Sequence, residues 1–352
     1  MPDAASPSLS ILPGRADAFR AEIVVRVAIP ADTARGGGDA AGPGRLSGTI
    51  TGPRRGRDTT LPTTVPLLDV RTGRPPDGPA TASARAVFTE PSYWTPELPN
   101  LYRLEARLDA DARPPVVIDR LIGLRRLGVR GRSFWLDGRR WVPRGVTVAG
   151  DERHVAALRG MSAAAVVGDP VEAVCAAADT AGVAVVAWFG GPGGGDRPAD
   201  DSAVERAAAR IATWSLHPAV MLVVVPALPD ETATAVMAAA RSLKGTMLVG
   251  LEVAGRCPPS AAAAADAADF LVLTLPAGQV PHEDWRAARH DRPLVAVREA
   301  AVETSAACRA ECDRLQADLA AWGLAGGAPP WDWAGYCIRG GRASASAAAG
   351  GW

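Results

Sequence analysis

The sequence predicts an all-β sandwich followed by an α/β domain, a closed barrel of eight parallel strands. Two observations support this. Up to about residue 130, Gly and Pro punctuate short alternating runs, whereas after Trp141 apolar runs alternate strictly with Ala-rich segments. With 352 residues, 48% of them hydrophobic, the chain is long enough for two domains that each bury a core.

The first part of the chain has the periodicity of β-strands. Residues 22–27 read Glu-Ile-Val-Val-Arg-Val, and residues 102–108 alternate in the same way, as a half-buried strand requires. Many short strands with turn-rich spacers are typical of a sandwich. We expect strands over 19–29, 45–51, 64–70, 81–88, 101–108 and 116–127, and loops over 35–44 and 73–79.

The second part alternates strands and helices. Its apolar runs carry few charges, which indicates strands buried on both faces and therefore a parallel sheet. Eight strands separated by seven helices is the count of a (β/α)8 TIM barrel, and an open doubly wound sheet is the alternative. The expected strands are 141–148, 163–167, 183–189, 220–225, 246–253, 270–275, 293–297 and 325–333, and the helices are 152–161, 171–181, 202–216, 231–243, 260–268, 283–290 and 304–322.

These patterns divide the chain into three parts. A sandwich is expected over 15–130 and a barrel over 133–338. The last segment, 339–352, consists mostly of Gly, Ala and Ser, so we expect a flexible tail in place of an eighth helix.

Composition argues against several classes of partner. The 38 basic and 38 acidic residues balance, so bulk charge does not favour nucleic acid or an anionic membrane. No apolar stretch reaches the ~18 residues of a membrane span. The amino-terminal residues lack the basic start and apolar run of a signal peptide, which predicts a cytoplasmic protein unless a leader was lost from the gene model.

The metal-binding residue types are scattered. The five cysteines give neither a disulfide framework nor a zinc motif, and buried thiols are the simpler interpretation. The four histidines lack metal-ligand spacing. We therefore expect no cofactor. The cysteines are Cys175, Cys257, Cys308, Cys312 and Cys337.

Three stretches carry distinctive motifs. Residues 94–102 read Trp-Thr-Pro-Glu-Leu-Pro-Asn-Leu-Tyr, residues 134–146 read Phe-Trp-Leu-Asp-Gly-Arg-Arg-Trp-Val-Pro-Arg-Gly-Val, and residues 326–333 read Gly-Gly-Ala-Pro-Pro-Trp-Asp-Trp. In this order they resemble glycoside hydrolase family 2, the β-galactosidases, β-glucuronidases and β-mannosidases. The resemblance implies that the sandwich is immunoglobulin-like, that a hairpin enters the barrel, and that the chain is truncated, since the family's leading jelly-roll domain is absent.

The resemblance also implies where catalysis would occur. Retaining glycosidases use an acid/base and a nucleophile, two carboxylates about 5–5.5 Å apart, and this family carries them after strands four and seven. After strand four the family's Asn-Glu pair falls on Ala227 and Leu228, which cannot deliver a proton. Asp230 is a weak acid/base candidate with helix capping as its alternative role, and Glu252, at the end of strand five, is another.

Strand seven keeps a carboxylate. Glu299 lies near the nucleophile's position in the resemblance, offset by one residue. Its alternative role is an ion pair with Arg298 or another arginine at the barrel rim. Trp188, Trp331 and Trp333 fall at expected strand ends, where an aromatic ring can stack on the apolar face of a sugar; core packing is the alternative.

The motifs support two functional hypotheses. The first is a relative with a degenerate active site, a pseudoenzyme retained as a carbohydrate-binding or interaction module. The second is a weak or altered retaining β-glycosidase with Glu299 as nucleophile and Glu252 or Asp230 as acid. A protein partner or an oligomer that covers exposed barrel surface, and an unrelated barrel activity, also stay open.

Overall fold

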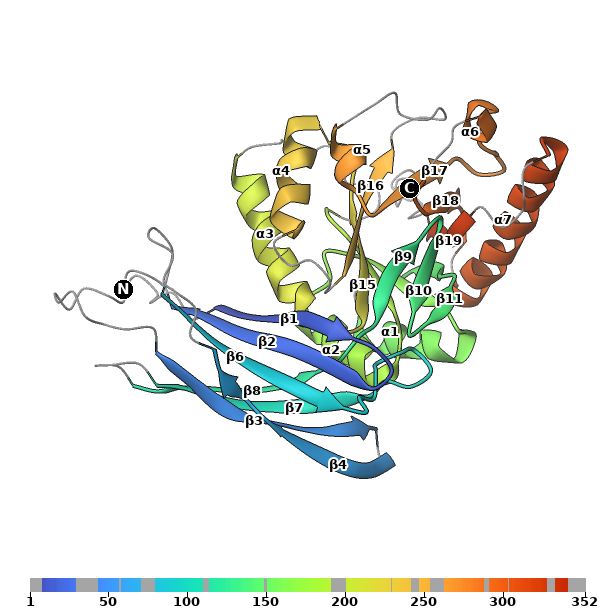
Figure 1. Cartoon of the computed structure of the whole chain (residues 1–352). Coiled ribbons are helices and arrows are strands. Elements are labelled where there is room, and N and C mark those ends of the chain that lie inside the picture. The colour runs from blue at the N-terminus through green and yellow to red at the C-terminus, as the bar shows by residue number, and fades with distance from the viewer. Residues whose placement is uncertain are drawn as a thin grey trace, which may run out of the picture. The chain divides into compact units, whose positions relative to one another are not determined.

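The chain forms two compact units in the computed structural model (Figure 1). The first comprises Met1–Arg126 and Ser215–Pro218, and the second comprises Leu127–Trp214 and Ala219–Trp352. The residues described are 8–29, 44–56, 58–70, 80–109, 114–148, 151–190, 201–228, 230–241, 247–253, 263–287, 291–302, 304–327 and 333–340.

The first unit is a β-sandwich, as predicted. Its two four-stranded sheets have the orders β1-β2-β6-β5 and β4-β3-β7-β8, and every pairing is antiparallel. The strands are β1 Ser8–Ala16, β2 Arg20–Ile29, β3 Arg45–Arg55, β4 Asp58–Pro66, β5 Leu68–Asp69, β6 Ala80–Thr89, β7 Leu101–Asp109 and β8 Val116–Ile122.

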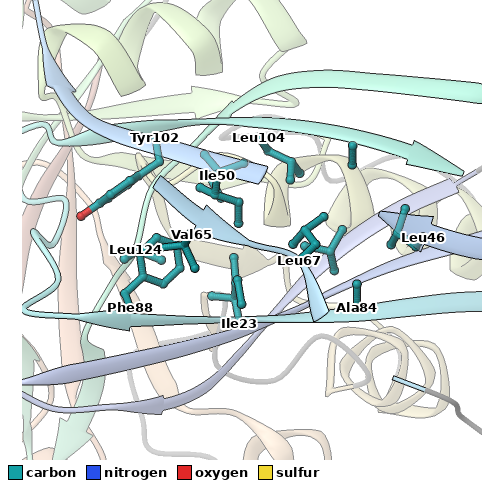
Figure 2. Packing of buried hydrophobic residues seen from close by; sticks show 14 of the residues in the cluster. Ile23, Leu46, Ile50, Val65, Leu67, Ala84, Phe88, Tyr102, Leu104 and Leu124 are labelled. Carbon is teal, nitrogen blue, oxygen red and sulfur yellow. The ribbon is translucent and has the colours of Figure 1, made fainter. Parts of the chain in front are cut away.

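The sandwich core lies between the two sheets. Ile23 on β2 and Phe88 on β6 point toward Ile50 on β3 and Leu104 on β7 (Figure 2). Each of these side chains is at most 4% exposed, because alternate residues of each strand face the core. Tyr102 on β7 also belongs to this core. Its ring lies edge-on to Phe88 with the ring centres 5.2 Å apart, and its hydroxyl accepts a hydrogen bond from the Ser92 backbone N–H.

The second unit contains a closed barrel of eight parallel strands, which confirms the predicted barrel and excludes the open sheet. The order β12-β13-β14-β15-β16-β17-β18-β19 follows the sequence, and β19 pairs with β12. The strands are β12 Arg144–Thr147, β13 Ala164–Gly168, β14 Val185–Trp188, β15 Val220–Val225, β16 Leu248–Val253, β17 Phe270–Leu275, β18 Leu294–Ala300 and β19 Trp333–Gly340.

Helices alternate with these strands, and α3, α4 and α7 lie outside the barrel in Figure 1. A three-stranded sheet precedes them, with the order β11-β10-β9. Its Phe134 is fully buried and packs edge-on against Phe270, the first residue of β17, so this sheet lies at the amino end of the barrel. The remaining elements are β9 Leu127–Arg130, β10 Ser133–Leu136, β11 Arg139–Trp141, α1 Glu152–Ala157, the 3-10 helix Leu158–Met161, α2 Glu172–Ala181, α3 Asp201–Ser215, α4 Asp230–Arg241, α5 Ala263–Ala267, α6 Asp284–Ala287 and α7 Ser305–Ala325.

The eighth strand differs from the prediction. The expected strand over 325–333 is wrong, because α7 continues to Ala325 and β19 begins at Trp333. The buried run Trp-Ala-Gly-Tyr-Cys-Ile forms the strand, whereas Gly326 and Gly327 end the helix. Arg339 and Gly340, expected in the tail, are the last residues of β19, and 341–352 lie outside the described residues.

Candidate functional site

The carboxyl ends of β16, β17, β18 and β19 bring polar side chains together. Parallel strands end at the same face of a barrel, which is the face where barrel enzymes carry their active sites. Glu252 is the penultimate residue of β16, Thr274 of β17, Glu299 of β18 and Arg339 of β19. Trp188 is the last residue of β14. We call these five residues the mouth cluster.

Arg339 lies across the inside of the barrel. Its Nη2 donates to Glu252 Oε1 at 3.0 Å, and its Cζ lies 4.9 Å from the centre of the Trp188 ring. In the closed order of strands, β19 is three places from β16 and three places from β14. Contacts with both of these strands can form only through the interior, so the guanidinium occupies the carboxyl end of the barrel lumen.

Glu252 is held as a hydrogen-bond acceptor. Its Oε1 accepts from Arg339 and also from Thr274 Oγ1 at 2.6 Å, and its side chain is only 14% exposed. A general acid needs an O–H directed at the substrate. In this arrangement Glu252 instead receives two donors, which is how a carboxylate anchors its neighbours.

Glu299 forms the exposed edge of the cluster. Its side chain is 52% exposed, and its Oε1 lies 3.6 Å from Arg339 Nη1 on the adjacent strand, where the two residues are register partners. The ion pair expected as its alternative role is therefore present. The partner is Arg339, because Arg298 points to the opposite face and donates to Asp318 on α7 at 2.6 Å.

Trp188 lies beneath the guanidinium. The residue is 1% exposed, so the ring offers no open face on which a sugar could stack in this conformation. Its Nε1 is buried and has no hydrogen-bond partner among the described residues, and the same holds for Nε of Arg339. Two buried N–H donors in contacting side chains thus lack an acceptor within the part of the chain that the structure describes.

A second ion pair lies at the end of β13. Asp169 adopts a left-handed backbone with a φ of 43°, which is uncommon for a residue other than Gly. Its carboxylate accepts from Arg210 on α3 and from the Gly190 backbone N–H. These bonds tie the ends of β13 and β14 together, and they account for the charge of Asp169 without a ligand.

The other predicted site residues lie elsewhere. Trp333 begins β19, at the end of the barrel opposite Glu299, where it is 4% exposed and packs against Trp322. Asp230 is the first residue of α4, and its side chain lies outside the described residues, as does all of Trp331. The structure therefore brings Trp188, Glu252 and Glu299 together and leaves Trp333 apart.

Sequence reasoning missed Arg339 and Thr274. Arg339 was assigned to the tail because the eighth strand was placed too early. The pattern that could have found it is the charged residue directly after the apolar run 333–338, which has the form of the other barrel strands. Thr274 lies inside a continuous apolar strand and carries no such pattern.

The described residues contain no group of three or more His, Cys, Asp or Glu side chains that could hold a metal ion. They also contain no helix long and apolar enough to cross a membrane.

No protein-family model matches the sequence, and no curated protein matches it. Several solved structures do match it in fold. A member of glycosyl hydrolase family 2 from Bacteroides cellulosilyticus superposes with a TM-score of 0.61 at 16% identity, covering 95% of this chain and 43% of that one. This chain has the fold of a glycoside hydrolase family 2 protein.

Two β-glucuronidases show the same likeness. A calcium-binding mutant of Bacteroides uniformis β-glucuronidase 2 has a TM-score of 0.60 at 14% identity, covering 95% of this chain and 46% of that one. Parabacteroides merdae β-glucuronidase has a TM-score of 0.54 at 14% identity, covering 83% and 39%. The chain thus spans less than half the length of these three neighbours, and identities this low establish shared fold only.

Proposed function

We propose that the protein binds carbohydrate at the carboxyl end of its barrel without hydrolysing it. The observation that carries this proposal is the position of Arg339, which contacts both carboxylates of the mouth cluster from inside the lumen. A site arranged in this way keeps groups that recognise hydroxyls, while both of its described carboxylates are engaged by Arg339.

The first argument concerns the described residues that could donate a proton. Among the described residues after β15, positions 226–228 read Pro-Ala-Leu, so no carboxylate follows that strand before α4. Loss of general acid catalysis removes about 10²–10⁴ in rate. Glu252, the nearest described carboxylate on β16, is occupied by Thr274 and Arg339.

The ligand class is the second argument. Glu299 is half-exposed at the barrel face where such folds bind ligands, and a carboxylate oxygen accepts hydrogen bonds from sugar hydroxyls. The proteins of similar fold include β-glucuronidases, whose name gives glycosides as their substrates. These two facts support carbohydrate as the ligand.

A retaining β-glycosidase is the second candidate. One observation favours it: a single guanidinium contacts the carboxylates of both Glu252 and Glu299, so the two groups lie near each other, as a catalytic pair must. Glu299 would act as nucleophile, and the acid would be either Asp230 or Glu252 after Glu252 is released from Thr274 and Arg339.

Binding and turnover measured together separate these functions. The purified chain is assayed against a panel of aryl β-glycosides and oligosaccharides, beside Glu299→Gln and the control Glu105→Gln, whose side chain is also 52% exposed. Saturable binding without turnover, altered by Glu299→Gln and not by Glu105→Gln, supports the proposal. Turnover that disappears in Glu299→Gln would establish the glycosidase, and the absence of both binding and turnover would overturn carbohydrate as the ligand.

A further inference from the structure

The mouth cluster has two features that its own contacts do not use. The first is its pair of buried donors, Trp188 Nε1 and Arg339 Nε, which have no acceptor among the described residues. A buried donor without a partner costs about 1–3 kcal/mol, so such groups are normally satisfied by water or a ligand oxygen. Trp188 is only 1% exposed, so bulk solvent does not supply an acceptor for its Nε1–H.

The second feature is charge. Glu252 and Glu299 are two carboxylates in contact with one guanidinium, so the mouth cluster carries an excess of one negative charge. The other ion pairs near these strand ends are balanced, since Asp169 is paired with Arg210 and Arg298 with Asp318. An approaching anion would meet the half-exposed Glu299 first.

We infer that the mouth cluster binds a hydroxyl group of a neutral sugar and discriminates against sugars that bear a carboxylate. The inference rests on the proposed function and names its ligand class. A hydroxyl oxygen accepts a hydrogen bond from the buried N–H donors, while its own O–H donates to a carboxylate of the cluster. A carboxylate ligand has no proton to donate and is repelled by Glu299.

Both donors are closed to solvent, so a ligand hydroxyl reaches them only when Arg339 moves aside from Trp188. Arg339 is 12% exposed at its side chain and covers Trp188, so a whole sugar ring does not enter beneath it. The ring of the ligand would lie outside, beside Glu299, and present one hydroxyl inward.

The test compares two ligands that differ only at one carbon. Phenyl 1-thio-β-glucoside and phenyl 1-thio-β-glucuronide resist hydrolysis and differ in a hydroxymethyl group against a carboxylate. Calorimetric titration of the full chain at pH 7 and low salt should show the glucoside binding at least about fivefold more tightly, and Glu299→Gln should reduce that preference because it removes the charge but keeps the size.

Each outcome has a distinct meaning. Tighter binding of the glucuronide, or equal binding unaffected by Glu299→Gln, would overturn the inference and leave carbohydrate binding standing. Failure of both ligands to bind would remove the proposed function and the inference with it.

The donors are tested separately. Trp188→Phe removes the N–H and should weaken glucoside binding about 2- to 10-fold, whereas Trp322→Phe, the same change on α7 beside Trp333, should not. Unchanged affinity in Trp188→Phe would overturn the assignment of the ligand hydroxyl to the buried donors. If Trp188→Phe does not fold, the comparison of the two ligands with Glu299→Gln still decides the inference.

Discussion

Arg339 donates to Glu252 across the barrel at 3.0 Å, although their strands are three places apart in the closed sheet. Both side chains are largely buried, at 12% and 14% exposure. Burying two charges costs several kcal/mol, which their mutual attraction offsets only while both are present. The interaction therefore makes the stability of the barrel depend on a group that lies in the candidate site.

Removal of Arg339 should destabilise the protein. Arg339→Met keeps an unbranched, largely apolar stem but leaves Glu252 buried without its cation, so we expect the free energy of unfolding to fall by about 2–4 kcal/mol. The double variant Arg339→Met, Glu252→Gln should recover part of this loss. Urea unfolding followed by circular dichroism is measured for the parent, for Arg339→Met and Glu252→Gln singly, and for the double variant.

The matched control is Arg15→Met, which breaks an exposed ion pair with Asp17 whose side chains are 74% and 37% exposed. It should leave the unfolding midpoint where it is, since exposed pairs contribute little. Strictly additive effects of the two changes in the double variant would contradict a coupled pair.

Much of the fold was predictable because burial on two faces leaves a continuous apolar run. The prediction for β15 over 220–225 and for β17 over 270–275 matches the structure to the residue. The eighth strand was placed too early because the motif over 326–333 resembles the family's eighth strand, whereas α7 continues to Ala325 and β19 begins at Trp333. The first strand, β1, was not predicted because Pro13 and Gly14 interrupt the alternation of apolar and polar residues.

Packing inside the barrel makes Gly250 sensitive to a single methyl group. A β-carbon built at Gly250 on β16 would overlap the ring of Phe270 on β17. Gly250→Ala should lower the free energy of unfolding by about 1–3 kcal/mol through overpacking. Combining it with Phe270→Leu, which shortens the obstructing side chain, should make the added cost of the alanine smaller.

Gly128→Ala is the control for this change, because nothing lies within 4 Å of a β-carbon at that position on β9. Its thermal midpoint should stay equal to that of the parent or rise slightly. If Gly250→Ala behaves like Gly128→Ala in calorimetry, the close packing of β16 against Phe270 is not as described.

The candidate site was only partly predictable, for a physical reason. Glu252 and Glu299 were recognisable because each is a charged residue at the end of an apolar strand. That they share one arginine follows from the closure of the barrel, which brings β16, β18 and β19 to one lumen. Closure is a long-range property, so no local pattern around Arg339 indicates its partners.

The sandwich offers a matched pair of leucines. Leu104 on β7 is fully buried in the core, whereas Leu61 on β4 is 93% exposed. Leu104→Ala should lower the free energy of unfolding of the first unit by about 2–5 kcal/mol, since it removes buried methyl groups and leaves a cavity. Leu61→Ala should have almost no effect in the same denaturation experiment, and equal losses would argue against this core.

Buried thiols should make the protein sensitive to alkali. Burial raises the pKa of Cys337 to about 12 and raises that of Cys312 well above its ordinary value. The unfolded chain loses these protons above about pH 8.5 while the folded chain keeps them. Below about pH 8.5 both thiols are protonated in the folded and unfolded chains, so their ionisation does not lower the stability of the fold. As the pH rises from about 9 toward 12, the free energy of unfolding should fall by about 1.4 kcal/mol per pH unit for each thiol.

Cys337→Ala should make the fall of the unfolding free energy with pH less steep by about 1.4 kcal/mol per pH unit, the contribution of one thiol. Val186→Ala, a truncation of a buried side chain on β14 that does not titrate, should lower stability by a similar amount at every pH. Urea denaturation at intervals from pH 7 to 10.5 gives the slopes. Parallel curves for Cys337→Ala and the parent would show that the Cys337 thiol ionises as readily in the folded chain as in the unfolded one, contrary to its complete burial behind Gly145.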